Sequence, residues 1–372
     1  MGRVLSHGAC RWVRPDAVHR DVYVDAGVYA LEVERLWSRT WVYLGHDSQV
    51  PVPGDRYALA IVGRTVAMTR ESGGSLSVQG AAAHAAHRGF VFVRLCGDGP
   101  PFDAWLGPMR AVIDAVADRS PTGRLQVVGA PIRSVFRANW KTYVENINDT
   151  VHPPSTHASV TDAAGTVWSR QPPGLPVPTA MQQLLQFGSG YEFFERMGAR
   201  TLPFGHSVLG TRSSIHASYE DPTGYASALR AAHGVARAAE VLGFAPQNAV
   251  LYPSLSLKAM PQAIRVIRPL AVDRTLVEAW AFQPEGAPAA LARRAAMYNR
   301  LVFSPMSVLA HDDLQVFEGI QQALRADGNP WVSLHRGCRV PESADQPAEV
   351  GGTDERLLRN QFAAWARALA CP

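Results

Sequence analysis

The chain has 372 residues, of which 47% are hydrophobic, and its formal net charge is only +4 although its pI is about 9.0. This length and apolar content can build one large or two ordinary globular domains. The arginines are spread along the chain, and no apolar run reaches the ~18 residues that a membrane-spanning helix requires. The composition therefore argues against binding to nucleic acid or insertion into a membrane, and predicts a cytoplasmic protein that acts on small molecules.

The four cysteines are widely separated, at Cys10, Cys96, Cys338 and Cys371. None belongs to a Cys-x-x-Cys or Cys-x-His pair of the kind that binds zinc or an iron–sulfur cluster. We interpret them as reduced thiols of a cytosolic protein, because a disulfide framework is typical of small secreted chains.

The N-terminal third predicts a short helix followed by β structure. In residues 25–41, Asp25 can cap a helix whose apolar positions include Leu31, Leu36 and Trp37. From Trp41 onward, short β-prone runs alternate with Pro-Gly-Asp, Gly-Arg and Ser-Gly-Gly turn signals, which indicate a small antiparallel sheet. The alanine-rich run GAAAHAAH at 80–87 predicts a shortened, exposed loop.

The rest of the chain predicts an antiparallel sheet between helices. Helical spacing is found at 106–117, 225–243, 288–303, 312–324 and 354–369, and β-prone segments at 127–140, 248–258, 262–270 and 274–283. The intervening stretch 168–212 is aromatic and irregular. Its side chains could line a substrate cavity, or could simply pack in the core.

Two histidines stand five residues apart in the stretch NWKTYVENINDTVHPPSTH at 139–157. Pro153 and Pro154 should end a helix that arrives from Lys141, so His152 and His157 can point at one ion. Two neutral imidazoles and one carboxylate form the facial triad that suits non-haem Fe(II). The alternative is a pair of unrelated surface histidines.

A helix that starts near Asp312 offers the carboxylate. Asp313 heads an apolar stripe with Phe317, Ile320 and Leu324, so it should face inward. Asp312 is rotated from it by about 100° and is better placed as an N-cap. The alternative is that both aspartates merely favour a helix N-terminus.

Asp149 stands three residues before His152, on the same side of the expected helix. Its carboxylate could therefore accept a hydrogen bond from the imidazole nitrogen that faces away from the metal, and so fix the tautomer. An ordinary surface capping role is the alternative for Asp149, and also for Asn146.

The run WVYLGHDSQVPVPGD at 41–55 resembles the beginning of the Rieske domain of ring-hydroxylating oxygenase α subunits. The stretch 139–157 and the pattern of Asp313, Glu318 and Gln321 resemble the same family. This resemblance implies an α+β fold, in which a truncated Rieske-like β domain precedes a helix-grip (START/Bet v1-like) catalytic domain with an antiparallel sheet and covering helices. It divides the chain into an N-terminal helical segment (1–40), a Rieske-like remnant without cluster ligands (41–105) and a catalytic mononuclear iron domain (106–372).

The chain departs from the family where the [2Fe–2S] ligands should stand. The family carries Cys-x-His and Cys-x-x-His there. Here His87-Arg88-Gly89 could be a remnant of the first half, with Ala85 in place of its cysteine, and the second half is missing. Several dozen residues of the family pattern are thus expected to be deleted between Gly80 and Phe90, and we expect no metal-binding role for His84 or His87.

The resemblance also implies a function and roles for individual residues. His152, His157 and Asp313 would hold Fe(II), and Asn146 would lie near its open positions. Asp149 would bridge, across a subunit interface, to the Rieske centre of a neighbouring chain. The protein would oxidise a small, aromatic substrate with O2, as the catalytic subunit of a hetero-oligomer built on trimers.

Because this chain is expected to hold no [2Fe–2S] cluster, its electrons would come from a Rieske-bearing α-type partner. A reductase or ferredoxin would supply that partner from NAD(P)H. Two rival hypotheses remain: a non-catalytic subunit that stabilises a Rieske-bearing chain, and a ligand-binding protein that uses the same cavity without iron.

Overall fold

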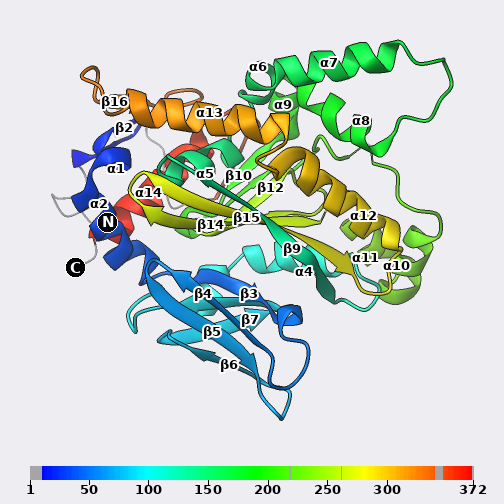
Figure 1. Cartoon of the computed structure of the whole chain (residues 1–372), viewed down its shortest axis with the longest axis horizontal. Coiled ribbons are helices and arrows are strands. Elements are labelled where there is room, and N and C mark those ends of the chain that lie inside the picture. The colour runs from blue at the N-terminus through cyan, green and yellow to red at the C-terminus, as the bar shows by residue number, and fades with distance from the viewer. Residues whose placement is uncertain (1–10, 218, 261, 340–346, 371–372) are drawn as a thin grey trace.

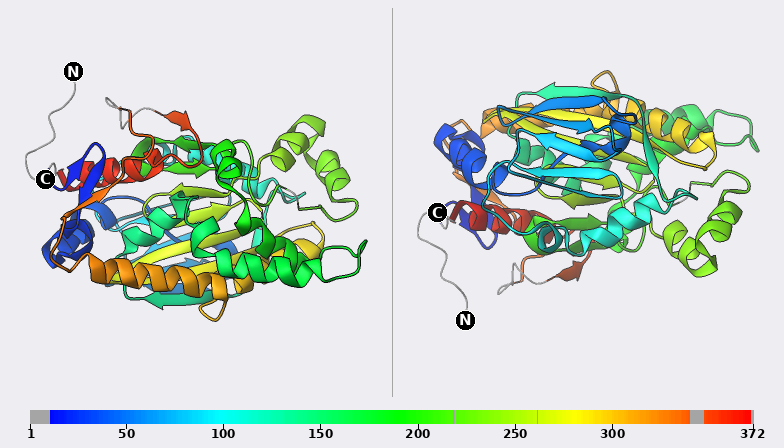
Figure 2. Two further views of the ribbon diagram at one scale, coloured as in Figure 1. Left: turned by 90° about the horizontal axis from the view of Figure 1, so that it is seen from above. Right: turned by 90° about the horizontal axis from the view of Figure 1, so that it is seen from below.

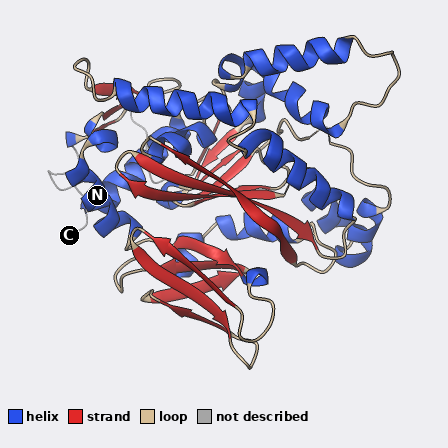
Figure 3. Ribbon diagram, viewed as in Figure 1, coloured by secondary structure: helices blue, strands red, loops and turns tan. Residues whose placement is uncertain are grey.

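The computed structural model describes residues 11–217, 219–260, 262–339 and 347–370, which are organised around an eight-stranded antiparallel sheet (Figures 1 and 3). Its strand order is β17-β10-β11-β12-β13-β14-β15-β9. The strands are β9 (Leu125–Phe136), β10 (Ala199–Thr201), β11 (Ser207–Leu209), β12 (Asn248–Leu251), β13 (Leu255–Lys258), β14 (Ala263–Ala271), β15 (Arg274–Pro284) and β17 (Ala348–Val350).

Next to the edge strand β9 lies the long hairpin of β14 and β15, which is rich in the β-branched and aromatic residues that favour strands. The chain turns at Val272-Asp273 between them, as the sequence predicts. The segment 248–258, expected as one strand, is instead the hairpin of β12 and β13. The predicted antiparallel sheet is otherwise confirmed.

The two faces of the sheet have different neighbours. One face carries Ile264, Val266 and Phe282, and packs against a small β region and two short helices, α3 (Phe102–Leu106) and α4 (Met109–Ala117). The opposite face is covered by α5 (Trp140–Asn148) and α13 (Val308–Ala323), with Phe317 packed near Val277. In Figure 1, α13 lies above the sheet and the small β region lies below it.

The small β region holds two three-stranded antiparallel sheets, β3-β8-β7 and β4-β5-β6. Their strands are β3 (Val42–His46), β4 (Arg56–Ile61), β5 (Arg64–Arg70), β6 (Leu76–Gln79), β7 (Ala83–His87) and β8 (Phe90–Arg94).

The prediction of an exposed loop at 80–87 is wrong, because Ala83–His87 forms β7 and pairs with β8. Arg88 and Gly89 both have left-handed φ values, 50° and 86°, which allow a tight hairpin turn between the two strands. Ala85 packs against the core from this strand. His84 and His87 are an odd number of positions apart, so they point to opposite faces of β7.

The N-terminal segment is more than a helix. A hairpin of β1 (Val13–Arg14) and β2 (Ala17–His19) pairs with the distant β16 (Trp331–Ser333). Two short helices follow, α1 (Asp21–Val24) and α2 (Ala26–Leu31), and Asp25 caps α2 as the sequence predicts by accepting a hydrogen bond from the Val28 amide at 2.8 Å.

Further helices surround the sheet, and Figure 2 shows them at its edges from above and below. The stretch 168–212, expected to be irregular, contains the end of α7 and all of α8 and α9. The expected helix at 225–243 is two helices, because the chain breaks at Gly234 with φ of 82°. These helices are α6 (Pro153–Thr156), α7 (Ala158–Ser169), α8 (Thr179–Leu185), α9 (Tyr191–Met197), α10 (Tyr225–His233), α11 (Val235–Gly243), α12 (Ala289–Tyr298) and α14 (Arg356–Ala370).

In the part of the chain that the structure describes, no helix combines the length and the hydropathy needed to cross a bilayer. Cys96 is a partly buried free thiol. Cys10 and Cys371 lie outside the described residues.

Candidate metal centre

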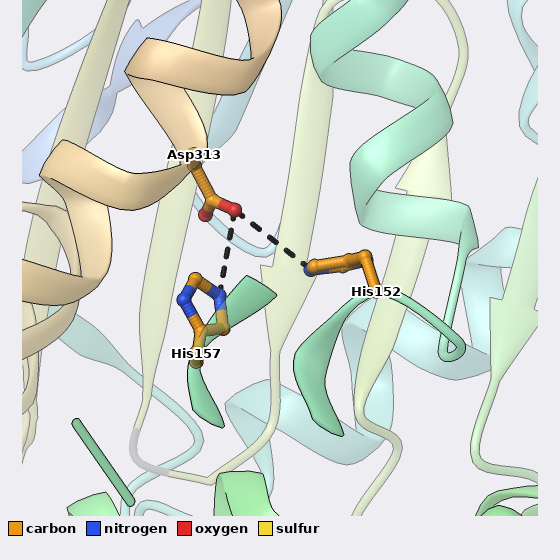
Figure 4. A group of neighbouring side chains, drawn as sticks. All are labelled: His152, His157 and Asp313. Atoms are coloured by element: carbon orange, nitrogen blue, oxygen red, sulfur yellow. Dashed lines mark ion pairs between the residues drawn. The ribbon is translucent and has the colours of Figure 1, made fainter. Parts of the chain in front are cut away.

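Three side chains from two separate parts of the chain meet between the sheet and its covering helices: His152, His157 and Asp313 (Figure 4). The Oδ1 atom of Asp313 lies 3.4 Å from Nε2 of His157 and 3.9 Å from Nε2 of His152. The possible ligand atoms all lie within 4.8 Å of one another. The structure therefore brings together the three residues that the sequence predicts as ligands, and their metal-binding role stays a prediction.

The two histidines flank the short helix α6. Helix α5 ends at Asn148, earlier than Pro153, where the sequence predicts its end. The cause is Asp149, whose extended backbone leaves the helix and whose carboxylate accepts hydrogen bonds from the backbone amides of Val151 (2.9 Å) and His152 (2.7 Å). His152 thus precedes α6, and His157 lies between α6 and α7.

Asp313 projects from α13, which begins at Val308 instead of near Asp312. The Ser307 hydroxyl caps this helix by accepting a hydrogen bond from the Ala310 amide at 3.2 Å, so the prediction of Asp312 as N-cap is wrong. The predicted inward stripe is also partly wrong, because Ile320 is 42% exposed. Phe317 and Gln321 are the buried positions below Asp313 on this helix.

Each histidine has a carboxylate behind the nitrogen that faces away from Asp313. The Nδ1 atom of His152 lies 2.9 Å from Oδ2 of Asp149, as the sequence predicts. The Nδ1 atom of His157 lies 3.3 Å from Oδ2 of Asp312, a contact that the sequence reading missed. Such pairs fix the tautomer and orientation of metal-binding imidazoles.

The electrostatics of the group favour the metal-binding form of His157 but act against the ionised form of Asp313. Burial lowers the pKa of His157 below its ordinary value, although Asp313 and Asp312 act in the opposite direction. The neutral imidazole, which is the form that binds metal, is therefore favoured. Burial raises the pKa of Asp313, and the nearby His152, His157 and Arg265 reduce that rise.

Asn146 and Asp149 complete the surroundings of the triad. The Nδ2 atom of Asn146 lies 3.0 Å from Nε2 of His152 and 3.3 Å from Oδ1 of Asp313, so this amide is beside the predicted ion. Asp149 also accepts a hydrogen bond from Nη2 of Arg336 at 2.9 Å. Burial alone would raise the pKa of Asp149, but its hydrogen bonds to His152 and the charge of Arg336 lower it below the ordinary value.

Glu318 and Gln321 hold α13 against the start of α5. The Glu318 carboxylate accepts a hydrogen bond from the Arg137 amide at 3.0 Å, and the Gln321 side chain accepts one from the Asn139 amide at 3.0 Å. These bonds connect the segment that carries the histidines to the helix that carries Asp313.

The observed donor set fits a small divalent transition-metal ion. Two imidazole nitrogens and one carboxylate oxygen, separated by 3.4 and 3.9 Å across the carboxylate, can share an ion with bonds of about 2 Å. Both imidazoles also have the carboxylate partners that such sites use. His152, His157 and Asp313 would therefore hold the ion.

Two cavities adjoin the triad, and both are lined by Asn146, Asp313, Val302, Phe303 and Arg265. Lys258 lines one of them. Arg265 and Lys258 were not among the site residues predicted from the sequence. The signal was present in β14, AIRVIRPLA, since alternation places Arg265 on the same face as the apolar Ala263 and Ile267.

Within the described ranges, His152, His157 and Asp313 are the one group of three or more His, Cys, Asp or Glu side chains close enough to share an ion. His84 is exposed, whereas His87 contacts the Asp114 carboxylate at 2.8 Å and the Arg110 guanidinium at 3.0 Å. His87, on β7, therefore interacts with the charged side chains of Arg110 and Asp114 on α4.

Comparison with known proteins gives a consistent result. Residues 114–370 match the model of the ring hydroxylating alpha subunit (catalytic domain). The chain is 26% identical to the toluate 1,2-dioxygenase subunit alpha of Pseudomonas putida (93% of this chain, 89% of the relative). It is 23% identical to the 2-halobenzoate 1,2-dioxygenase large subunit of Burkholderia cepacia (91% and 82%). The toluate alignment extends over 425 residues, more than the 372 of this chain, so that relative has residues without a counterpart here.

The fold is similar to that of naphthalene 1,2-dioxygenase from a Rhodococcus species, solved with indole bound. The TM-score is 0.72 at 18% identity, and the match covers 96% of this chain and 95% of the other. This likeness confirms the expected α+β fold with its large antiparallel sheet and covering helices.

Proposed function

The chain belongs to the ring-hydroxylating alpha-subunit family through its catalytic domain, and on this premise we propose that it is the oxygenase subunit of a multi-component enzyme. Its substrate would be a small aromatic compound, and its electrons would come from a Rieske cluster on a partner subunit. The observation that supports this proposal most is the group of His152, His157 and Asp313, with a carboxylate behind each imidazole.

The family uses a mononuclear iron, which His152, His157 and Asp313 would hold in this chain. When bound, Fe(II) supplies the redox chemistry by which O2 and an organic substrate react. The protein would orient the imidazoles through Asp149 and Asp312, and would present the Asn146 amide beside the reacting groups. The apolar walls at Val302, Phe303 and Phe317 would exclude water and contact the substrate ring.

Electron supply is the reason for proposing a partner. The sequence carries neither the Cys-x-His nor the Cys-x-x-His motif, and Ala85 packs in the core where the first of these would stand. A Rieske-bearing α-type subunit, reduced from NAD(P)H through a reductase or ferredoxin, would deliver the electrons. The relatives are named as alpha or large subunits, which supports a hetero-oligomer, and we propose that it is built on trimers.

Asp149 is the proposed point of electron entry. Its carboxylate contacts His152 on one side and Arg336 on the other. Arg336 in turn lines a hollow with Tyr191, Glu195 and Thr353, outside the triad cavity. A partner's cluster that approaches this hollow would reach His152 through two side chains, Arg336 and Asp149.

A second candidate function is that of a structural subunit whose triad is not used. The two are separated by His157→Ala, with the exposed His311→Ala as the matched control. We expect the His157 variant to assemble with the Rieske-bearing partner but to lose turnover with the reductase and NAD(P)H, while the His311 variant keeps both. A His157 variant with full turnover in the complex would support the structural role.

A further inference from the structure

Lys258 and Arg265 are two basic side chains buried in the wall of the triad cavity, each only 4% exposed. They lie on β13 and β14, on the sheet face that looks toward the covering helices. Within the described chain, neither has a carboxylate at ion-pairing distance. Burying an unpaired charge is costly, so such a pair of cations calls for an explanation.

The hydrogen-bond partners of Arg265 are neutral side chains. Its Nη2 atom donates hydrogen bonds to Oδ1 of Asn248 and, at 3.1 Å, to the Ser256 hydroxyl. Its guanidinium carbon lies 4.9 Å from the ring centre of Phe303. Its Nε atom has no hydrogen-bond partner in the part of the chain that is described. Arg265 is thus held in place by its Nη2 group, while its Nε–H group makes no hydrogen bond within the described chain.

Lys258 is held in a similar way. Its Nζ atom donates a hydrogen bond to the backbone carbonyl of Gln247 at 2.8 Å and lies 5.6 Å from the ring centre of Tyr298. Burial lowers the pKa of Lys258 well below its ordinary value, and the charge of Arg265 lowers it further. Arg265 is therefore the permanent charge of this wall, and an arriving anion would favour the protonated form of Lys258.

The acidic residues nearby do not neutralise these cations. Asp149 lines the same cavity but is ion-paired with Arg336 at 2.9 Å. Asp312 and Asp313 face the histidines, and a divalent ion at the triad would balance their two negative charges. The charge of Arg265, and that of Lys258 when protonated, then remains without a counter-ion.

Buried basic residues elsewhere in the protein show the contrast. Lys141 is ion-paired with the buried Glu32, and Arg268 is ion-paired with the buried Glu278 at 2.9 Å. Arg268 stands only three positions from Arg265 in the same strand, but on the opposite face of the sheet. The fold thus supplies a carboxylate to Lys141 and Arg268, and it holds the buried Arg119 with the backbone carbonyls of Val241 and Phe244, both at 2.9 Å. Arg265 and Lys258 differ from all three because they also line a cavity.

We propose that the cavity takes an anionic substrate, a small aromatic acid, whose carboxylate pairs with Arg265 and Lys258 while its ring lies against Phe303 and Val302. Arg265 is then a specificity-determining residue, since its guanidinium offers two donors to a carboxylate. This inference rests on the proposed function for the word substrate, but the binding of the anion is measured without turnover.

The test compares benzoate with benzamide, its neutral analogue of nearly the same shape, by calorimetric titration of the purified full chain. We expect benzoate to bind at least about 10-fold more tightly, because a charged hydrogen-bonded pair is formed only with the carboxylate. Equal affinities, or tighter binding of benzamide, would overturn the inference without any substitution of the protein.

Variants show which side chains produce the preference for benzoate over benzamide. Arg265→Gln should weaken benzoate binding about 10-fold or more and leave benzamide within about 2-fold, because one charged hydrogen-bonded contact is lost. Lys258→Met provides a second variant, with the same expected direction. Arg268→Gln, on the opposite face of the sheet, is the control for the loss of a buried arginine; its folded chain, although less stable, should keep the preference for benzoate. A preference that survives both cavity variants would contradict the inference.

One further variant separates this inference from the proposed function. Asp313→Asn should lose metal and activity but keep the preference for benzoate over benzamide. A wild-type chain that binds iron and turns over with its partner, yet binds benzamide as well as benzoate, would refute the anion site alone. A chain that prefers benzoate but never binds iron would refute the proposed function alone.

Discussion

The two faces of the central sheet treat buried charge in opposite ways. On the face toward the small β region, Arg268 and Arg133 both contact Glu278, at 2.9 and 2.8 Å. On the face toward α5 and α13, Arg265 and Lys258 have no carboxylate partner in the described chain, and the histidine and aspartate ligands point into a cavity. On the first face the chain itself supplies the partners of its buried charges, whereas we propose that an ion and an anionic ligand supply them on the second face.

This difference explains how one sheet can serve both stability and function. A buried charge that is neutralised by its own chain contributes to a unique fold, and removing one partner destabilises that fold. A buried charge without a counter-ion lowers the free energy of unfolding until a ligand of opposite charge binds.

The largest effect is expected from the triad on the cavity face. Asp313→Ala should reduce oxygenation in the complex at least about 1,000-fold, because the ion loses its one anionic ligand. The iron content should fall with the activity, as measured by elemental analysis. Asp162→Ala changes an exposed aspartate of α7 and is the matched control. A normal iron content in the Asp313 variant would show that the ion is held elsewhere.

On the opposite face, the expected effect is on stability. Arg268→Gln leaves Glu278 buried with one partner fewer, and should lower the free energy of unfolding by about 3–5 kcal/mol in denaturant titration. Arg265→Gln removes an unpaired charge, so its loss of stability should be much smaller. Similar losses of unfolding free energy in the two variants would show that the two faces of the sheet do not differ in this way.

A smaller effect on metal affinity is expected from the residue behind His157. Asp312→Asn keeps the shape of the side chain but weakens its interaction with Nδ1 of the imidazole, at 3.3 Å in the wild type. We expect metal affinity to fall about 10- to 100-fold, with the fold unchanged. Competition with a chelator of known affinity measures this change, and an unaltered affinity would show that Asp312 does not orient the ligand.

The smallest effect is a pH dependence of stability, from a histidine outside the cavity. His206 accepts a hydrogen bond from the Tyr252 amide at 3.0 Å and lies 2.9 Å from the Trp105 carbonyl, and burial lowers its pKa to about 4. Because the unfolded chain binds this proton more readily, the free energy of unfolding should fall as the pH drops from about 6.5 toward 4.

Between pH 6.5 and 5 the contribution of His206 should be about 1–2 kcal/mol. Denaturant titrations of His206→Gln across this range should give a shallower pH dependence than those of the wild type. Parallel curves for the two proteins would show that the proton is taken up elsewhere.

Local patterns explain what the sequence could predict. The two prolines between His152 and His157 predict that both imidazoles can point at one ion. The helical period predicts that Asp313 faces inward. The strands of the large sheet follow from their β-branched residues and turn signals. The exact ends of helices were harder to predict, since Ser307 competes with Asp312 for the cap and Asp149 ends α5 before the prolines do.

The errors and omissions involve contacts between distant segments. The strand β7 is alanine-rich and looks like a loop until its pairing with β8 is known. Arg336 lies far along the chain from Asp149, and nothing in its own neighbourhood points to that contact. Arg265 looks like an ordinary polar residue of a strand, because the sequence does not tell which elements cover the sheet face on which Arg265 lies.

The central claim is that oxidation takes place at the triad of this chain, with electrons from the partner. The most direct test is product formation by the complex of the two subunits, when this chain carries His157→Ala and the partner is unchanged. We predict that the complex forms, that the partner's cluster is still reduced, and that product formation is lost. Product formation at the wild-type rate would contradict the account.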